Sequence, residues 1–487
     1  MPVPATNALF DFTVDQKTVI GYEQDEVENL QKLLSTMSIS DLEHLGYALT
    51  NLVITGRVQS TDGSLTIVLE APVPGTIFPQ NTLRVGDEVE IVGPNGEPAG
   101  KASKSSKGKK NQKTQAIGVV KKIMATVALV YIGPQPAIPS SWSRGCSLKV
   151  VANNISYQRM LDALSSLSKW PGERPTMHHV LFGSLEPAFN TSPFLTDSDF
   201  IDKSLNEEQK RAVDFSVRAK DVALIHGPPG TGKTHTLIEV IQQLYRQGKT
   251  LLVCGPSNIS VDNIAVRLGE IGGIPMVRLG HPARVSKQAQ KYSAESQVKE
   301  TADTEYIKEC RAQLANITKA LRGCKNVPVR QELKRMANVQ RTIINKHTNK
   351  ESKVIFKNTK VVLATLCGSG GPAVAKLKMK FDVVIIDESA QAIEGECWIA
   401  GVQAPKLILA GDHHQLPPTM ISPKNQSLKK SAASDSVAGN GDLMSTTMFE
   451  RVRNKLGDRV CHMLTTQYRM HSKIMKVSNE NLYDNLL

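Results

Sequence analysis

Cysteine is scarce in this chain, and the few cysteines are scattered. Seven of them occur among 487 residues, and no two form a C-x-x-C pair. This spacing indicates neither a zinc knuckle nor a disulfide framework. It is typical of a protein from a reducing intracellular compartment.

Long hydrophobic runs are also missing. The first residues, "MPVPATNALFDF", contain no basic segment followed by an apolar one, which a secretory signal would have. No run approaches the roughly 20 apolar residues that a transmembrane helix needs. We therefore expect neither secretion nor insertion into a membrane.

Acidic residues are outnumbered by basic ones. The chain has 59 Lys and Arg against 46 Asp and Glu, a formal net charge of +13. An excess of this sign favours a polyanionic partner such as nucleic acid. A merely basic surface explains the charge equally well. The length predicts two to four structural units of roughly 150 residues each.

The first 200 residues change their periodicity twice. Apolar residues at helical spacing between about 24 and 50 predict N-terminal stalk helices within 1–50. Short alternating runs with Gly, Pro and Asn-Gly turns predict a small antiparallel β-barrel over 51–153. The pattern "SYQRMLDALSSL" then predicts a stalk helix, followed by a linker, within 154–200.

A lysine-rich stretch, "GKASKSSKGKKNQK" (100–113), interrupts the barrel pattern. It contains no apolar residue larger than alanine, so we expect a solvated loop. The loop is either a flexible connector or a contact for nucleic-acid phosphates. Lysines without interleaved aromatic residues supply affinity and no sequence readout.

Residues 201–487 read as one α/β domain. The segments "DVALIHG", "TLLVCG", "TKVVLATL", "FDVVIIDE" and "KLILAGD" are short apolar runs, as expected of strands buried on both faces of a parallel sheet. A long polar insertion, 286–355, carries apolar residues every three or four positions on both sides of the breaker "GCKNVP". It predicts an antiparallel helical hairpin, with a dimerising coiled coil as the alternative. The seam residues would be Ile307, Cys310, Leu314, Ile317, Leu321, Val329, Leu333, Met336, Val339 and Ile343.

A second insertion, "SPKNQSLKKSAASDSVAGNGD", has few large apolar residues. We expect it to be disordered.

The stretch "HGPPGTGKTHT" matches the pattern G-x-x-x-x-G-K-[ST] between a strand and a helix, the context that the pattern requires. Glycines let backbone N–H groups approach phosphates, Lys233 would bridge the β- and γ-phosphates, and the Thr234 hydroxyl would bind Mg²⁺. The expected phosphate site comprises Gly227, Pro228, Pro229, Gly230, Thr231, Gly232, Lys233, Thr234 and His235.

Polar residues follow two further strands. Asp387 and Glu388 end a buried strand, where a doubly wound sheet places its ligand site. Asp387 would be a direct or outer-sphere Mg²⁺ ligand, and Glu388 would take a proton from the attacking water. Gln415 follows the next strand and could bond either the γ-phosphate or that water. His413 and His414 predict no metal site, because they are adjacent and no third His or Cys accompanies them in sequence.

These segments resemble the superfamily 1 helicases that move 5′ to 3′, in the branch of the immunoglobulin mu-binding and nonsense-decay helicases. The resemblance rests on "LNEEQKRAV", "GPPGTGKT", "GPSNISVDNIAVRL", "VRLGHPAR", "VVLAT", "DESAQA", "ECWIA", "GDHHQLPPT" and "QYRMH", in family order. It is strong over about 205–485 and weak before that. It implies a RecA-like P-loop NTPase domain preceded by a barrel and stalk.

The resemblance also implies residue roles. Gln209 would recognise adenine and Tyr468 would stack on it. Gln415 would sense the γ-phosphate, and Arg469 would be an arginine finger. The residues implied to face the nucleic-acid strand are Pro256, Ser257, Asn258 and Thr365. His235 and Ser389 stand at positions that vary in the family.

The implied activity is ATP-dependent 5′ to 3′ unwinding of DNA or RNA, with ATP and Mg²⁺ as cofactors. Motifs of a second RecA-like domain have no counterpart in the 487 residues, so we expect the N-terminal part of such a helicase. The alternative is a truncated form that binds ATP and nucleic acid without catalysis. A GTPase or small-molecule kinase is disfavoured, because no guanine-reading N-K-x-D follows. We further expect a monomer that binds single strands, in the nucleus and cytoplasm.

Overall fold

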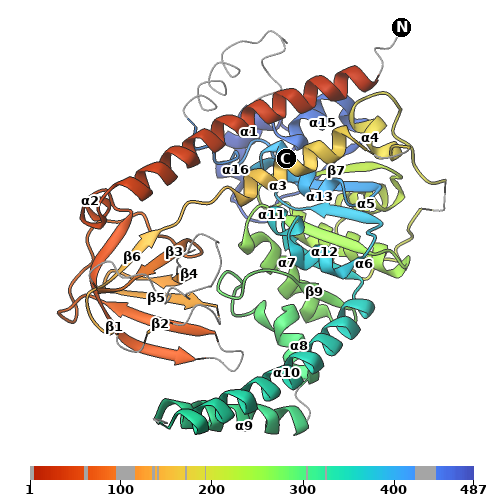
Figure 1. Cartoon of the computed structure of the whole chain (residues 1–487). Helices are drawn as coiled ribbons and strands as arrows, with labels where there is room; N and C mark the ends of the chain where they lie inside the picture. Colours follow the sequence, from red (N-terminus) through yellow and green to blue (C-terminus); the bar gives the residue numbers. More distant parts are fainter. Residues whose placement is uncertain are drawn as a thin grey trace. The chain divides into compact units, whose positions relative to one another are not determined.

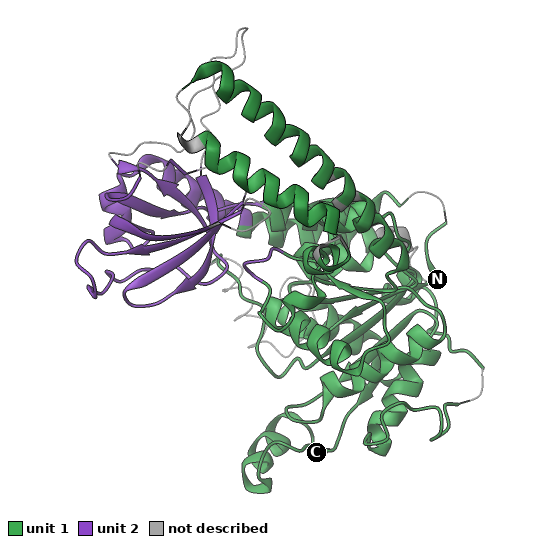
Figure 2. Ribbon diagram, turned by 90° about the horizontal axis from the view of Figure 1, so that it is seen from below, with its two compact units in different colours: residues 1–23, 155–280, 285–487 green, residues 24–154, 281–284 purple. Residues whose placement is uncertain are grey.

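We analysed a computed structural model of the chain. It describes all residues except 1–4, 60–63, 95–115, 134–137, 140–141, 171–172, 192–193, 303–304, 324–325 and 423–445. The lysine-rich stretch 100–113 and nearly all of the second insertion therefore lie outside the described residues. The chain divides into two compact units, drawn green and purple in Figure 2. Unit 1 comprises 1–23, 155–280 and 285–487, and unit 2 comprises 24–154 and 281–284.

Unit 2 is built around a closed antiparallel barrel (Figure 1). Its strand order is β1-β2-β5-β4-β3-β6, and alternate residues such as Ile67 and Leu69 fill its interior. The first five strands match the alternating runs at 52–58, 64–71, 87–93, 116–123 and 125–133, and the sixth was not predicted. The strands are β1 (Ala48–Gln59), β2 (Leu65–Glu70), β3 (Glu88–Val92), β4 (Ala116–Ile123), β5 (Val127–Ile132) and β6 (Cys146–Val150).

The N-terminal helices are longer than their sequence pattern indicated. Helix α1 (Ala5–Thr36) begins well before residue 24, and α2 (Ile39–His44) follows it. The first part of α1 belongs to unit 1, where Leu9, Phe12 and Ile20 are buried in a core cluster. The amphipathic pattern of this first part was missed, because Thr, Asp and Gln interrupt the apolar residues. The predicted domain boundaries at 50, 153 and 200 remain a prediction.

Unit 1 contains a seven-stranded parallel sheet, as predicted for an α/β fold. Its strand order is β13-β7-β12-β11-β8-β10-β9. Five strands coincide with the predicted apolar runs. The two edge strands, β9 and β13, have three residues each and are too short to give a pattern. The strands are β7 (Val222–His226), β8 (Leu251–Gly255), β9 (Met276–Arg278), β10 (Val361–Thr365), β11 (Val383–Ile386), β12 (Lys406–Gly411) and β13 (Cys461–Met463).

Helices cover both faces of this sheet (Figure 1). Residues of one strand alternate between two core clusters: Leu224 belongs to the first, and Ala223 and Ile225 to the second. Burial on both sides explains why these strands read as continuous apolar runs. The helices are α3 (Ile155–Ser168), α4 (Thr176–Leu181), α5 (Glu207–Arg218), α6 (Lys233–Arg246), α7 (Asn258–Ile271), α11 (Leu366–Ser369), α12 (Pro372–Leu377), α13 (Glu394–Gly401), α15 (Met448–Leu456) and α16 (Ser472–Leu482).

The insertion between β9 and β10 contains the predicted helical hairpin, α9 (Glu305–Gly323) and α10 (Val327–Asn358). A further helix, α8 (Ala294–Ala302), was not predicted. On α9 the predicted seam residues Ile307, Cys310 and Ile317 are buried.

The predicted seam of α10 was wrong in part, since Leu333 and Ile343 are partly buried but the other three residues are not. Val329, Met336 and Val339 are about half exposed, whereas Ala337 is buried. The inward face also carries Gln340, whose Nε2 donates to Gln313 Oε1 at 2.8 Å. Small and polar residues on the inward face hid the true register, because the prediction followed large apolar side chains only.

None of the helices among the described residues combines the length and the apolar character needed to cross a bilayer.

Candidate nucleotide and nucleic-acid sites

The predicted phosphate loop connects β7 to α6 at the carboxyl edge of the sheet. Gly230 and Gly232 have φ angles of 78° and 80°, in the left-handed region that glycine adopts without strain. The Lys233 side chain folds back over Gly227, where an added Cβ would lie 2.7 Å from Lys233 Cβ. The glycines at 227, 230 and 232 are therefore required by local geometry, and the loop leads directly into the N-terminus of a 14-residue helix.

Asp387 and Glu388 follow β11, which is separated from β7 only by β12. Lys233 Nζ lies 2.8 Å from Glu388 Oε1, so the two predicted catalytic residues form an ion pair. Asp387 is 2% exposed, and burial raises its pKa to about 6, while the Lys233 ammonium opposes the rise. Glu388 has a φ of 54°, an uncommon backbone conformation for a residue with a side chain. Such strain is often found at functional sites.

Gln415 lies in the loop after β12, between these two groups of residues. The backbone N–H of Gly227 donates to the Gly411 carbonyl at 3.1 Å, which links this loop to the phosphate loop. The Gln415 side chain does not stand alone, because its Nε2 donates to Asp412 Oδ2 at 2.8 Å. Asp412 itself is 1% exposed.

Asp412 has two further partners that the sequence did not suggest. His226 Nε2 lies 3.1 Å from its Oδ1, and the Tyr483 hydroxyl donates to its Oδ2 at 2.7 Å. Burial alone would raise the pKa of Asp412, but hydrogen bonds from His226, Gln415 and Tyr483 hold it well below its usual range. No sequence signal joins these residues, since His226 and Tyr483 are far from Asp412 along the chain.

The histidines near Asp412 form a group that sequence reasoning did not foresee. A third histidine, distant in the sequence, lies beside His413 and His414 in space, because the His226 and His413 rings are 5.0 Å apart. Ligand atoms of His226, Asp412 and His413 lie within 4.8 Å of one another. However, the Arg453 guanidinium contacts the His413 ring. A fixed positive charge at that position opposes binding of a metal cation.

The predicted adenine contacts lie beside the phosphate loop. Gln209 belongs to a capping box at the start of α5, and its Nε2 donates to the Thr231 carbonyl at 3.1 Å. The Tyr468 backbone N–H donates to the Gly230 carbonyl at 2.9 Å, and its side chain is 66% exposed. Gln209 therefore has a structural role in addition to any contact with a base.

Arg469 and His235 also border the phosphate loop. An added Cβ on Gly230 would lie 2.6 Å from Arg469 Cβ, so the arginine backbone passes close to the loop while its side chain is exposed. The His235 ring is hydrogen-bonded to Asp202. The structure thus brings the predicted nucleotide residues together at one edge of the sheet.

The residues predicted to face a nucleic-acid strand lie at the other half of the same edge. Strands β8 and β10 are neighbours, and Gly255 pairs in register with Thr365. Ser257 and Thr365 are N-caps of α7 and α11, accepting from the Ser260 and Gly368 N–H groups.

Behind these caps lies a buried ion pair. Arg278 is 1% exposed; its Nε donates to Asp262 Oδ1 at 2.8 Å, and its Nη2 donates to Asn258 Oδ1 at 2.9 Å. This pair fixes the Asn258 side chain. The exposed Ile259, at 73%, is a further residue here that the sequence did not single out.

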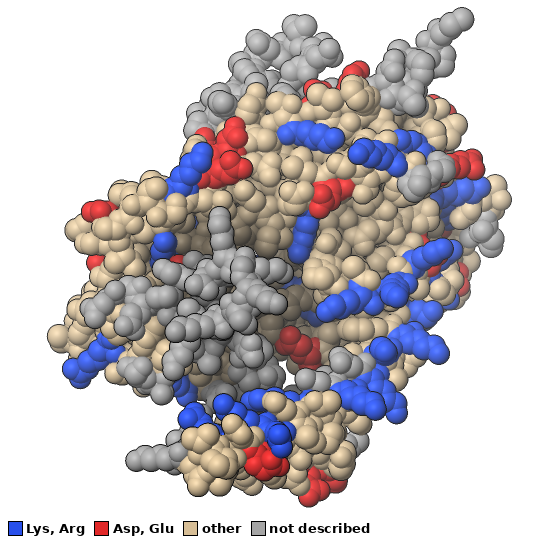
Figure 3. Space-filling view, in the orientation of Figure 1, with Lys and Arg blue, Asp and Glu red and all other residues tan. Residues whose placement is uncertain are grey.

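Basic side chains are prominent on the inserted hairpin. Lys and Arg far outnumber Glu along α10. In Figure 3 blue side chains prevail over red ones around the end of α10 nearest the sheet. This distribution suits contact with phosphates.

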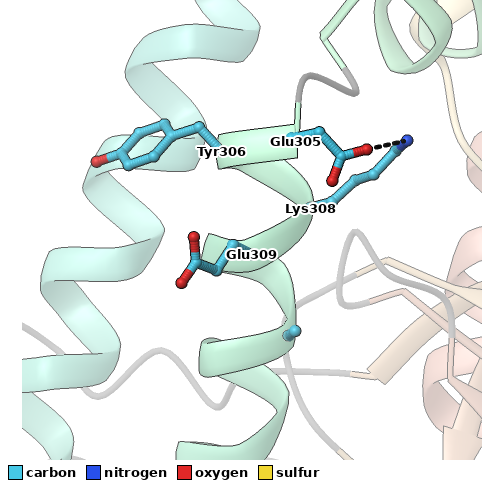
Figure 4. A pocket seen from close by; sticks show the side chains of 5 residues that line it. Glu305, Tyr306, Lys308 and Glu309 are labelled. Atoms are coloured by element: carbon cyan, nitrogen blue, oxygen red, sulfur yellow. Dashed lines mark hydrogen bonds and ion pairs between the residues drawn. The ribbon is translucent and has the colours of Figure 1, made fainter.

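A hollow of about 590 Å³ lies along α9 (Figure 4), and none of its lining residues belongs to either candidate site. Its lining residues, Glu305, Tyr306, Lys308, Glu309 and Ala312, all belong to this one helix. Glu305 and Lys308 form an exposed ion pair of 3.5 Å. Because a single helix surface lines it, the hollow does not enclose a ligand.

Comparison with known proteins relates the chain to helicases. Two family models, each described as an AAA domain, match residues 204–423 and 444–487. The DNA polymerase alpha-associated DNA helicase A of Schizosaccharomyces pombe is 36% identical over 479 residues, which cover 96% of this chain and 67% of that protein. DNA-binding protein SMUBP-2 of Rattus norvegicus is 32% identical over 491 residues, which cover 98% of this chain and 46% of that protein.

The chain therefore spans between about half and two thirds of these relatives. Among solved structures, a PRRSV helicase is 12% identical, with a TM-score of 0.26, over 85% of this chain and 48% of that one.

Proposed function

We propose a function on the basis of the family to which the chain belongs. This family is the superfamily 1 helicases related to the immunoglobulin mu-binding and nonsense-decay helicases. The chain would be the ATP-binding part of an ATP-dependent helicase that moves 5′ to 3′ along single-stranded DNA or RNA. The observation that carries this proposal is the 2.8 Å pair between Lys233 and Glu388, beside a buried Asp387. Two carboxylates and a lysine at one P-loop suit phosphoryl transfer.

Phosphate binding would change the partner of Lys233. The γ-phosphate of ATP competes with Glu388 for the ammonium group, because both are anions within reach of one cation. Once released, the Glu388 carboxylate can accept a proton from the attacking water. Binding of substrate would thereby produce the free base that the reaction needs.

The site fits a magnesium ion. Asp387 is a buried carboxylate whose ionisation is opposed by burial, so a cation beside it would be favourable. We assign the ion to Asp387 and the Thr234 hydroxyl. When bound, Mg²⁺ would neutralise charge on the β- and γ-phosphates.

The remaining nucleotide residues would act on the base and the transferred phosphate. Gln209 would contact adenine and the exposed Tyr468 ring would stack on it. Arg469 would place its positive charge near the γ-phosphate. Stabilisation of this kind by an arginine is worth about 10³ to 10⁵ in rate in phosphoryl-transfer enzymes.

Nucleic acid would bind across the other half of the sheet edge. The neutral groups of Ser257, Asn258 and Thr365, with Pro256, would contact a single strand without reading its sequence. The basic side chains of α10 would add phosphate contacts. The lysines of 101–113, which lie outside the described residues, are either further phosphate contacts or part of a flexible connector. We expect a monomer acting in the nucleus and cytoplasm.

A nucleotide titration tests the ATP site. Wild type should bind ATP in preference to GTP, because Gln209 can read adenine, and Lys233→Ala should weaken ATP binding by at least about ten-fold, since it removes a charged partner of the phosphates. Lys249→Ala is the matched control, because this exposed lysine precedes β8 at the opposite edge of the sheet. Equal affinities of wild type and Lys233→Ala would refute the site.

Steady-state hydrolysis decides between the helicase and the alternative, a form that binds ATP and nucleic acid without catalysis. Hydrolysis stimulated by single strands supports the motor. Binding without stimulated hydrolysis, in the longest natural form of the protein, supports the alternative.

The affinity for single strands should fall steeply as the salt concentration rises. Replacing the six lysines of 101–113 should reduce the slope of log affinity against log salt concentration if this stretch contacts phosphates.

A further inference from the structure

Asp412 is a buried carboxylate that accepts hydrogen bonds from four directions. Gln415 Nε2 and the Tyr483 hydroxyl donate to Oδ2 at 2.8 and 2.7 Å. The His414 backbone N–H donates to Oδ1 at 3.1 Å, and His226 Nε2 lies at 3.1 Å from the same atom. An ionised carboxylate with this many donors is held rigidly, because each bond to a charged group is stronger than a neutral one.

This arrangement determines how the Gln415 amide is turned. A carboxylate can only accept hydrogen bonds, so the amide atom that faces it must be Nε2. The carbonyl oxygen, Oε1, is then directed away from Asp412. The orientation of the Gln415 amide is therefore fixed by its carboxylate partner, although its oxygen and nitrogen atoms are similar in size.

The same carboxylate connects three separate parts of unit 1. His226 immediately precedes the phosphate loop, and Tyr483 directly follows α16. The His226 ring must carry its proton on Nε2 to donate to Asp412. Its Nδ1, which is buried, has no hydrogen-bond partner among the described residues. Among the described residues, the hydrogen bond to Asp412 is thus the one that the His226 ring makes.

We propose that Asp412, held by His226 and Tyr483, positions Gln415 so that Oε1 accepts a hydrogen bond from the water that attacks the γ-phosphate. This inference rests on the proposed function, and it chooses between the two partners that the sequence left open for Gln415, the γ-phosphate and the attacking water. The water oxygen forms a bond to the γ-phosphorus, and the bond from phosphorus to the bridging oxygen breaks. ADP leaves with the electron pair. One water proton passes to Glu388, and Gln415 only orients the other O–H.

The first test separates positioning from nucleotide binding. It compares affinity for ADP with affinity for ADP–aluminium fluoride, which imitates the transferring phosphoryl group with a water in line. Tyr483→Phe and His226→Leu each remove one bond to Asp412, so affinity for the mimic should fall by about three- to ten-fold while ADP affinity stays unchanged. His226→Gln, which keeps a donor, should recover much of the loss.

Tyr245→Phe is the matched control. Its hydroxyl donates to the Gly273 carbonyl, remote from the carboxyl edge of the sheet. This variant should bind ADP and the mimic as wild type does. A parallel loss of affinity for ADP and the mimic in Tyr483→Phe would indicate a merely structural role and would overturn the proposal.

The second test distinguishes an acceptor from a donor at position 415. Gln415→Glu alone places two carboxylates together and should weaken binding of the mimic. In the double variant Asp412→Asn with Gln415→Glu, the new amide donates to the new carboxylate, and an acceptor oxygen again faces the water. We expect the double variant to bind the mimic at least about three-fold more tightly than either single variant. A double variant as weak as Gln415→Glu would show that Gln415 must donate.

Binding of ADP and binding of the mimic distinguish the proposed function from the positioning role. A wild type that binds neither ADP nor the mimic would refute the proposed function, and this assignment with it. A wild type that binds both, together with Tyr483→Phe and His226→Leu variants that bind the mimic as tightly as it does, would refute only the positioning role.

Discussion

The two halves of the sheet's carboxyl edge in unit 1 use different kinds of side chain. After β7, β11 and β12, the candidate residues are charged and paired, as in the ion pair between Lys233 and Glu388. After β8 and β10, they are the neutral caps Ser257 and Thr365. The charged half suits binding of a polyphosphate. The neutral half suits binding of a nucleic-acid strand without sequence specificity.

The difference suits the roles proposed for the two halves. Phosphoryl transfer concentrates negative charge, which only charged groups or metal ions can balance. A single strand that moves must be released, so weak neutral contacts suit it better. The ion pair of Arg278 and Asp262 is buried behind the neutral half, where Arg278 also fixes the Asn258 side chain.

The largest effect is expected from removing the charge of Glu388. Glu388→Gln deletes the proposed base, so the rate of hydrolysis should fall by about 10² to 10⁴. ATP should bind as tightly as in wild type or more tightly, because Lys233 no longer has a competing carboxylate. Single-turnover hydrolysis and a nucleotide titration measure the two quantities. Loss of ATP binding together with hydrolysis would contradict this division of roles.

The second prediction concerns the buried pair behind the neutral half. Arg278→Met leaves Asp262 buried without its charged partner, which should lower the free energy of unfolding by about 3–5 kcal/mol. Chemical denaturation measures this loss.

The double variant Arg278→Met with Asp262→Leu should regain most of that stability. It should still bind single strands less well than wild type, because Asn258 is no longer held. Restoration of both properties would show that the pair serves the fold alone.

The sequence predicted which charged residues lie together at the edge of the sheet, but not the contacts behind them. Lys233, Asp387 and Glu388 each follow a strand that is buried on both faces, and such strands give clear apolar runs. The contact of Tyr483 with Asp412 could not be predicted, because it depends on how α16 packs against a strand end. The sequence pattern also missed the register of α10, where Ala337 rather than Met336 is buried. Local patterns report burial, whereas pairing between distant residues depends on tertiary packing.

The third prediction uses the raised pKa of Asp387, about 6 in the folded protein. This pKa lies above that of an Asp in the unfolded chain. The buried carboxyl group therefore costs little stability at low pH, where it is protonated, and destabilises the fold as the pH rises through about 6 and it must ionise. Asp387→Asn should therefore be more stable than wild type by about 1–3 kcal/mol at pH 7.5, and by less at pH 4.5. Unfolding of the nucleotide-free protein at both pH values measures the difference.

The same substitution that raises stability should weaken ligand binding. Asp387→Asn should bind ATP less well in the presence of Mg²⁺, because a neutral amide is a poorer ligand for this ion. A variant that is both more stable and equally able to bind Mg²⁺ and ATP would remove Asp387 from the site.

The smallest effect is expected at the neutral half itself. Ser257→Ala removes the N-cap of α7 and should lower the free energy of unfolding by about 1 kcal/mol. Thr447→Ala removes the N-cap of α15 by the same chemistry, outside the candidate strand surface, and is the matched control. If Ser257 contacts a strand, only Ser257→Ala should also weaken single-strand binding, by about two- to five-fold, the size of one neutral hydrogen bond. Fluorescence anisotropy with a labelled oligonucleotide measures this difference, and equal binding by the two variants would show that Ser257 serves only as a cap.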